Sequence, residues 1–497
     1  MQNKSLKVVV VGGGTSGWMS AALLKKVLGD SIELELVESE QIGIVGVGEA
    51  TIPPIQQVNQ VLGIDEAEFM RETKATIKLA IKFEHWQNLN QDYFHTFGSA
   101  GKSLPFCHYH HLWVRAHQLG LDDNLWDHDL NYHACVAEKF AKLQVKDPLF
   151  DMKYAYHFDS GLYGQFLRKV SEKMGVKRTE GFIESIQLNP QTGHVESLTL
   201  KDSSVVNGDL FIDCSGFKGL LINQKLGSGF EDWSHWLPCD SAIAVPTERF
   251  EKTLPYTRSI AREFGWQWQI PLQHRNGNGL VYSSRYVSDE TAKETLLSNL
   301  TTPTLAEPKL IKFKTGRALK QWNKNVVAVG LASGFLEPLE STSIYLVQSA
   351  IVRLLKFFPQ TEISPASVDE YNRQSKLEYE QIRDFIILHY YVTQRTDSQF
   401  WLDMQKMQVP ERLANKIKIF EATGTITHDE FDVFWEPSWL QVMLGQGIKP
   451  KAYHPLANQF SEQQLTELMR TMKQNKQAPV NNMPDHDNFL AMYLSKG

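Results

Sequence analysis

The first forty residues predict a β-strand, a helix and a second strand from their order of apolar runs. An unbroken valine run occupies residues 8–11, and a second strand-like run occupies residues 32–37. Between them, residues 18–28 have the apolar spacing of a helix that packs one face against a sheet. This order is typical of a βαβ unit and therefore predicts an α/β fold.

The turn after the first strand carries glycines at the spacing of a dinucleotide-binding loop. Gly12, Gly14 and Gly17 follow the GxGxxG pattern, and Glu38 closes the second strand. Glycine lets the backbone approach a pyrophosphate, whose charge is met by amides at the helix N-terminus, while the carboxylate accepts hydrogen bonds from ribose hydroxyls. We predict a bound dinucleotide, with a purely structural tight turn as the alternative.

The rest of the chain shows further strands and then helices. Strand-like patches recur at residues 195–200, 210–214 and 326–329. The periodicity blurs over residues 85–150, which are rich in aromatic residues and histidine, and this indicates an insertion. From Ile344 onward the pattern is mostly helical, with a tail at residues 474–488 whose Gln, Asn, Pro and Asp content predicts loose order.

Composition narrows the partners of this chain of 497 residues. The 51 Lys and Arg residues against 57 Asp and Glu residues give a net charge of −6, which disfavours nucleic acid as a partner. The 4 cysteines are far apart and form no CxxC pair, so we expect a reduced, cytoplasmic protein. No apolar stretch approaches the roughly 20 residues of a membrane span, and we expect no membrane partner.

Two local patterns are candidates for chemistry. Ser341, Thr342 or Ser343 can cap the helix that follows, and an uncovered helix N-terminus offers free amides to an anion such as a halide. Ordinary side-chain capping is the alternative. Lys78 belongs to a set of lysines spaced by four that lies on one side of a helix or in a strand, and a solvated face is its simpler interpretation.

Histidines cluster in the insertion without a metal-binding spacing. His108, His110 and His111 have no familiar zinc pattern and no cysteine or carboxylate beside them in a known motif. We therefore expect packed or solvated histidines and no metal site.

Motifs spread along the chain resemble those of the flavin-dependent halogenases, the tryptophan halogenase family. The resemblance runs from the first strand to about residue 460. It rests on GGGTSGW at 12–18, GVGEATIP at 46–53, IKLAIKF at 77–83, HFD at 157–159, DCSGF at 213–217, GWQWQIP at 265–271 and EPLEST at 337–342. The GWxWxIP motif is the most specific, because it separates these halogenases from hydroxylases that share their FAD module.

The resemblance implies a fold and a division of the chain. The fold is an FAD-binding flavoprotein module of the aromatic-hydroxylase type, with a βαβ dinucleotide fold, plus a mainly helical substrate-binding region. The expected parts are residues 1–84 and 151–358 for the FAD-binding module, residues 85–150 for an insertion that contributes to the substrate pocket, and residues 359–497 for the helical region.

The resemblance also implies the site residues. Lys78 and Glu340 match the catalytic residues, and Thr342 and Ser343 match residues whose amides hold the halide. The family usually has glycine at the position of Ser343. The implied FAD-binding residues are Gly12, Gly14, Ser16, Gly17, Glu38, Ala50, Ile183, Leu331 and Ile344. The implied substrate-pocket residues are His95, Phe97, Glu430, Phe434 and Trp435.

The implied activity is halogenation of an aromatic ring. FADH2 supplied by a separate flavin reductase, O2 and chloride or bromide give hypohalous acid, and Lys78 directs electrophilic substitution of a small indole-like substrate. The tyrosine pair expected soon after Trp435 is absent, so the substrate need not be free tryptophan. A flavin-dependent hydroxylase and a non-catalytic flavin-binding protein are the alternatives, and either a monomer or a homodimer is expected.

Overall fold

The computed structural model of the chain describes residues 5–42 and 48–495 and contains two compact units. Unit 1 consists of Met1–Ala75, Phe158–Asp240 and Lys312–Glu380. Unit 2 consists of Thr76–His157, Ser241–Ile311 and Gln381–Gly497. The four-part division expected from the sequence stays a prediction.

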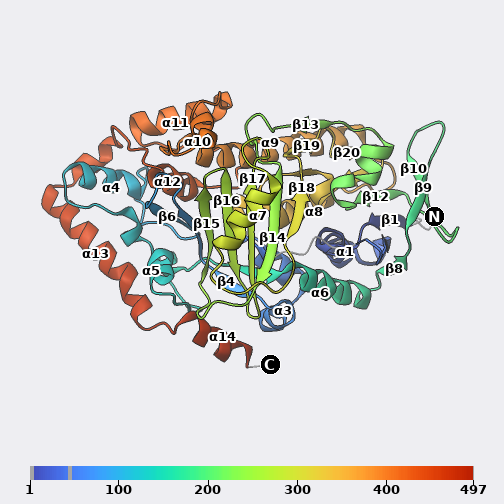
Figure 1. Cartoon of the computed structure of the whole chain (residues 1–497), viewed down its shortest axis with the longest axis horizontal. Helices are drawn as coiled ribbons and strands as arrows, with labels where there is room; N and C mark the ends of the chain where they lie inside the picture. Colours follow the sequence, from blue (N-terminus) through green and yellow to red (C-terminus); the bar gives the residue numbers. More distant parts are fainter. Residues whose placement is uncertain (1–4, 43–47, 496–497) are drawn as a thin grey trace. The chain divides into compact units, whose positions relative to one another are not determined.

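Unit 1 is built on a six-stranded sheet with the order β20-β21-β12-β1-β2-β8. Figure 1 labels β20, β12, β1 and β8 of this sheet. Its strands are β1 (Leu6–Val11), β2 (Ile32–Glu38), β8 (Lys177–Glu180), β12 (Leu210–Asp213), β20 (Trp322–Asn323) and β21 (Val326–Ala328). β1 runs parallel to both neighbours, with Val8 opposite Leu34 and Leu210. The valine run of β1 is buried, as expected for a central strand of a parallel sheet covered on both faces.

Helices and two small sheets complete unit 1. α1 (Thr15–Leu28) connects β1 to β2, so the predicted βαβ unit is confirmed, and α1 packs beside α6 and α8. The remaining helices are α2 (Ile55–Leu62), α3 (Glu66–Thr73), α6 (Ser160–Lys173), α8 (Ser343–Lys356) and α9 (Pro365–Tyr391), of which α9 belongs to unit 1 up to Glu380 and to unit 2 from Gln381. The remaining strands are β3 (Gly48–Ala50), β9 (Ile183–Leu188), β10 (Val195–Leu200), β11 (Val205–Asn207), β13 (Phe230–Asp232), β19 (Gly316–Ala318) and β22 (Gly334–Phe335).

Unit 2 is built on a seven-stranded, mostly antiparallel sheet with the order β18-β14-β17-β16-β15-β5-β6. Its strands are β5 (Ala80–Glu84), β6 (Asp92–Thr96), β14 (Ser241–Thr247), β15 (Tyr256–Arg262), β16 (Gly265–Pro271), β17 (Asn276–Tyr282) and β18 (Lys309–Lys312). A separate antiparallel pair joins β4 (Thr76–Lys78) to β7 (Ala155–Asp159). The alternating tryptophan motif forms β16, which is buried along its whole length.

The helices of unit 2 include the chain's C-terminal part. They are α4 (Tyr109–Gln118), α5 (Leu130–Val136), α7 (Asp289–Ser298), α10 (Gln399–Gln405), α11 (Glu411–Thr423), α12 (Glu436–Gly445), α13 (Glu462–Asn481) and α14 (His486–Leu494). The expected loose order of the tail is wrong. α13 lies beside α4 and α5 (Figure 1), and this packing, through buried residues such as Leu465 and Met469, outweighs the weak helix-forming composition.

The predicted α/β fold with a helical C-terminal region is confirmed. Among the described residues after Thr342, the regular elements are helices, and there is no strand. Within those same described ranges, none of the helices combines the length and the apolar character that crossing a bilayer requires. The cysteines are unpaired thiols.

Candidate active site

The glycine loop of unit 1 has the close packing that a dinucleotide-binding turn needs. Gly12 has φ +111°, and a side chain on it would lie 2.4 Å from the carbonyl oxygen of Cys214. A side chain on Gly17 would lie 1.8 Å from the carbonyl oxygen of Gly12, so α1 starts directly against the end of β1. A side chain on Gly14 would meet nothing within 4 Å. The open side at Gly14, beside uncapped helix amides, fits the approach of a pyrophosphate.

The acidic residue at the end of β2 is held beside this loop. A side chain on Gly13 would collide with the Glu38 carboxylate at 1.4 Å, so that carboxylate lies against the loop backbone. Arg178 donates from Nε to Glu38 Oε1 at 2.5 Å, and this hydrogen bond raises the pKa of Arg178. The amide of Gly181 donates to the carbonyl of Glu38 at 2.8 Å, which brings the start of β9, and with it Ile183, to the same end of the sheet.

The other residues expected to hold FAD lie in unit 1, and most of them lie near the glycine loop. Gly330 has φ +66°, and a side chain on it would lie 2.4 Å from Ser16 Oγ and 3.7 Å from Val347 of α8. Leu331 is the residue directly after Gly330, which packs against Ser16, and Ile344 lies one helical turn before Val347 in α8. Ala50 is buried in β3. Gly46 and Val47, which begin the GVGEATIP motif, lie outside the described residues.

The side chain of the N-cap residue does not cap the N-terminus of α8. Thr342 is the N-cap residue, in an αR conformation, with no hydrogen bond from its side chain to a helix amide. Ser341 precedes it with φ +60°. Thr342 and Glu340 are each 1 % exposed, whereas Ser343 is half-buried. Ordinary side-chain capping by Thr342, one of the interpretations open from the sequence, is therefore not what the structure shows. Anion binding by the first-turn amides stays a prediction.

Lys78 is fully buried in unit 2. It ends β4, where it pairs with Ala155 of β7, and its exposed fraction is 0 %. Its Nζ lies 5.2 Å from the centre of the Phe97 ring. A buried lysine facing an aromatic ring is uncommon, because desolvating an ammonium costs free energy. By contrast, Lys82 of β5 is half-buried and pairs with Asp92 at 2.9 Å, so the two lysines occupy different environments.

An aromatic cluster lies at the C-terminal end of β6. His95 is 3 % exposed, and its ring centre lies 6.3 Å from that of Phe434. Phe434 stacks on Phe385 of α9 at 4.0 Å, and the Phe385 ring meets Trp439 edge-on at 4.8 Å. Because His95 and Phe97 are two residues apart at the end of β6, the structure brings this cluster and Lys78 to the same strand end. Sequence reasoning missed Phe385, since nothing in α9 distinguishes it from an ordinary core residue.

The predicted substrate residues in the loop before α12 differ in their exposure to solvent. Phe434 is 5 % exposed, whereas Trp435 is 65 % exposed and its ring lies tilted against that of His428, with the ring centres 4.3 Å apart. Glu430 is exposed at the surface of the loop. α12 itself is joined to the edge of β6 by Gln441, whose Oε1 accepts from the Thr96 amide at 2.7 Å. Sequence reasoning did not single out Gln441, because a buried glutamine on a helix carries no recognisable spacing.

The histidine cluster of α4 makes contacts with protein groups. His108 and His110 each face Glu436, at 2.9 and 3.1 Å, and His110 also bonds the carbonyl of Gly424. Burial and the neighbouring histidines lower the pKa of His111 to about 3, so it is neutral at pH 7. Within the described residues no group of acidic, histidine and cysteine side chains has the geometry of a metal site.

Known proteins share the sequence and the fold of this chain. The family described as "Tryptophan halogenase" matches residues 7–462. The chain belongs to the tryptophan halogenase family. Tryptophan 7-halogenase RebH of Lentzea aerocolonigenes is 33 % identical, over 99 % of each chain.

Solved structures of halogenases superpose closely on this member of the family. Xcc4156, a flavin-dependent halogenase from Xanthomonas campestris, is 46 % identical with a TM-score of 0.96, over 99 % of both chains. BrvH, a flavin-dependent halogenase from Brevundimonas sp. BAL3, is 41 % identical with a TM-score of 0.95, over 99 % of this chain and 100 % of that one.

As a member of the tryptophan halogenase family, the protein is a flavin-dependent enzyme, as its motifs predicted. The glycine loop, Glu38 and the Gly330 turn fit the FAD that the family requires, since collisions exclude side chains at Gly12 and Gly17 and the Gly14 side stays open. The roles of the individual residues stay predictions.

Proposed function

We propose that this enzyme halogenates an indole-like, electron-rich aromatic ring, with Lys78 as the residue that delivers the halogen. The observation that carries the proposal is the complete burial of Lys78 with its Nζ 5.2 Å from the Phe97 ring. An amine that is removed from water and faces an aromatic surface interacts with substrate and oxidant rather than with solvent.

We assign the binding of FAD and halide to residues of unit 1, and the transfer of the halogen to Lys78 of unit 2. In unit 1, Gly12, Gly14, Ser16, Gly17, Glu38, Ala50, Ile183, Leu331 and Ile344 hold FAD. Bound FAD, reduced by a separate flavin reductase, supplies the electrons with which O2 converts a halide to hypohalous acid. The first-turn amides at Thr342 and Ser343 hold the chloride or bromide, because the macrodipole of α8 favours an anion there.

In unit 2, the Lys78 amine receives the oxidised halogen. Nζ either donates a hydrogen bond to hypohalous acid or is halogenated with release of water. The substrate ring then attacks the halogen and loses a proton, which regenerates the aromatic ring. Holding the halogen at one buried nitrogen fixes the ring position that reacts. In unit 1, Glu340, which is also buried, is the proposed second catalytic residue, which orients the oxidant or accepts a proton.

The proposed substrate is an indole-like aromatic rather than free tryptophan alone. The aromatic surface of His95, Phe97 and Phe434 suits a flat ring, while Glu430 and Trp435 are exposed and the tyrosine pair is absent. The part of the proposed site that would bind the amino and carboxyl groups of free tryptophan is loosely enclosed. This favours indole-like substrates that lack these groups.

A bromination assay tests the proposal. Purified enzyme, a flavin reductase, NADH, O2 and bromide are incubated with tryptophan, indole and substituted indoles, and products are read by mass spectrometry. We expect the bromine isotope doublet on indoles. A product heavier by one oxygen identifies a hydroxylase instead, and turnover of tryptophan alone overturns the substrate assignment.

A further inference from the structure

The loop that joins α11 to α12, residues 424–435, is fixed by side chains of α9 and α11. It contains no α-helix or strand, and Phe431 within it has φ +65°. This connecting loop nevertheless carries three of the proposed substrate residues, Glu430, Phe434 and Trp435. A loop of irregular backbone keeps one conformation only where surrounding groups fix it.

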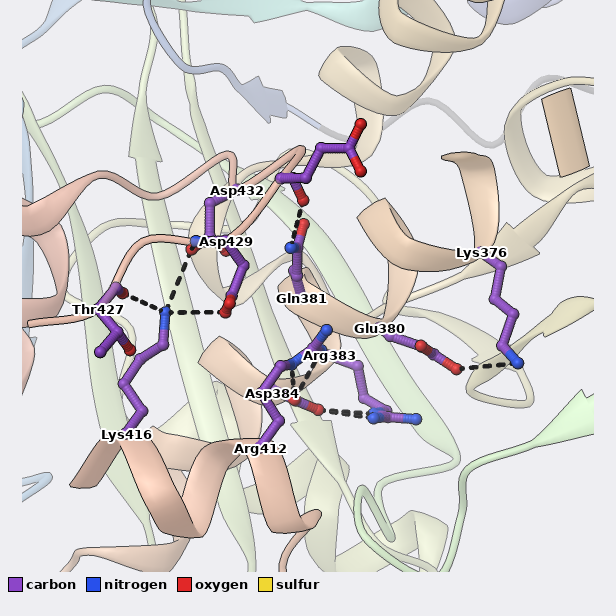
Figure 2. Close-up of polar contacts among 11 residues, drawn as sticks. Lys376, Glu380, Gln381, Arg383, Asp384, Arg412, Lys416, Thr427, Asp429 and Asp432 are labelled. Carbon is purple, nitrogen blue, oxygen red and sulfur yellow. Dashed lines mark hydrogen bonds and ion pairs between the residues drawn. The ribbon is translucent and has the colours of Figure 1, made fainter. Parts of the chain in front are cut away.

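Lys416 of α11 is the main such group. It is 3 % exposed, and its Nζ donates to the carbonyl of Thr427 at 2.8 Å and pairs with Asp432 at 3.2 Å and Asp429 at 3.5 Å. Figure 2 shows the ammonium between these three points of the loop. The Nζ also lies 4.3 Å from the centre of the Trp439 ring. One buried charge therefore connects the start and the middle of the connecting loop to α11 and α12.

Gln381 of α9 supplies a second anchor. Its Nε2 donates to the carbonyl of Glu430 at 2.6 Å, and its Oε1 is buried without a hydrogen-bond partner among the described residues. Next to it, Asp384 accepts from Arg412 of α11 at 2.7 Å and from Arg383 at 2.7 Å, which ties α9 to α11 (Figure 2). The two helices that anchor the loop are thus fixed to each other.

We propose that Lys416 is a positioning residue for halogenation, which acts by fixing the connecting loop against the aromatic cluster. This inference rests on the proposed function of Phe434 and Glu430 at the substrate. The loop conformation keeps Phe434 stacked on Phe385, 4.0 Å away, and so sets the surface on which the substrate ring lies.

The charge of Lys416, not only its bulk, is what the loop needs. The carboxylates of Asp432 and Asp429 lie close together, because both pair with Lys416 Nζ, at 3.2 and 3.5 Å. Without the ammonium they repel each other, and Asp432, which is 8 % exposed, is left as a buried charge. The loop then moves outward to hydrate them, and Phe434 loses its fixed place.

The test compares Lys416→Met with Lys418→Met, a matched control because Lys418 is exposed on the same helix. With indole and bromide, we expect KM to rise about tenfold or more in Lys416→Met, the effect of losing a hydrogen bond to a charged group. The ratio of brominated isomers should change, FAD affinity should not, and amide exchange at residues 424–435 should quicken. Lys418→Met should match the wild type.

A charge-retaining variant provides a rescue experiment, and specific results would overturn the inference. Lys416→Arg keeps the charge and should recover most of the isomer ratio. Should Lys416→Met not fold, Asp429→Asn carries the same expectation at about two- to threefold in KM. If faster loop exchange leaves KM and the isomer ratio unchanged, or if loop exchange itself is unchanged, the inference is overturned. If the wild type brominates no ring, the proposed function fails instead.

Discussion

Two glycines of the FAD loop should respond in opposite ways to the same added methyl group. In Gly17→Ala the methyl lies 1.8 Å from the Gly12 carbonyl oxygen, a backbone atom that cannot rotate away. Such overpacking costs about 1–3 kcal/mol, and alanine's better helix propensity returns up to about 1 kcal/mol. Because the contact is with a backbone atom, we take the upper part of this cost, about 2–3 kcal/mol, less about 1 kcal/mol for helix propensity, and expect Gly17→Ala to lose about 1–2 kcal/mol of unfolding free energy.

In Gly14→Ala the methyl meets nothing within 4 Å, and φ of −74° suits alanine. The unfolding free energy should change by no more than about 0.5 kcal/mol. FAD affinity, however, should fall at least about tenfold, because the methyl fills the side from which the pyrophosphate approaches. Urea unfolding without FAD and a flavin-fluorescence titration measure the two quantities. A Gly17→Ala protein as stable as the wild type, or a Gly14→Ala protein with unchanged FAD affinity, refutes this account of the loop.

Three further outcomes concern single polar side chains. Gln441→Leu should lose about 1–3 kcal/mol of unfolding free energy, because it leaves the Thr96 amide, now bonded at 2.7 Å, without its acceptor; urea denaturation measures this. Burial raises the pKa of Glu49 to about 7, so the folded state retains a proton that the unfolded state releases from about pH 4.5, and stability falls between these pH values. Glu49→Gln should flatten that fall, by at most about 3 kcal/mol, in thermal melts from pH 4.5 to 8. Arg258 binds Glu84 with two hydrogen bonds of 2.6 and 2.7 Å, and Arg258→Lys should cost about 1–2 kcal/mol in the same urea assay, since lysine cannot make both.

Local patterns in the sequence predicted the elements whose geometry is local. The β1-α1-β2 unit, β10, β12 and β21 follow from apolar runs and glycines, because a strand or helix face needs only its own residues to be recognised. The motif resemblance predicted the family for the same reason, since each motif is short and contiguous.

Features that depend on distant pairing were not predictable. Lys78 and Lys82 look alike in the sequence, and the burial of Lys78 follows from the pairing of β4 with β7, which no local pattern indicates. The contact of Phe385 with Phe434 joins a helix to a loop in the same way. The tail was expected to be loose because composition carries no information about the packing of α13 on α4 and α5.

Replacing Lys78 is the most direct measurement of how this enzyme halogenates. Lys78→Met keeps the length of the side chain and removes its nitrogen, and Lys82→Met is the matched control, since Lys82 is half-buried and paired with Asp92. Both variants are assayed for bromination of the best indole, with FAD affinity and O2 consumption measured in parallel. We expect Lys78→Met to bind FAD and consume O2 but to give no brominated indole above background, and Lys82→Met to match the wild type. Wild-type bromination by Lys78→Met contradicts the central role of this residue.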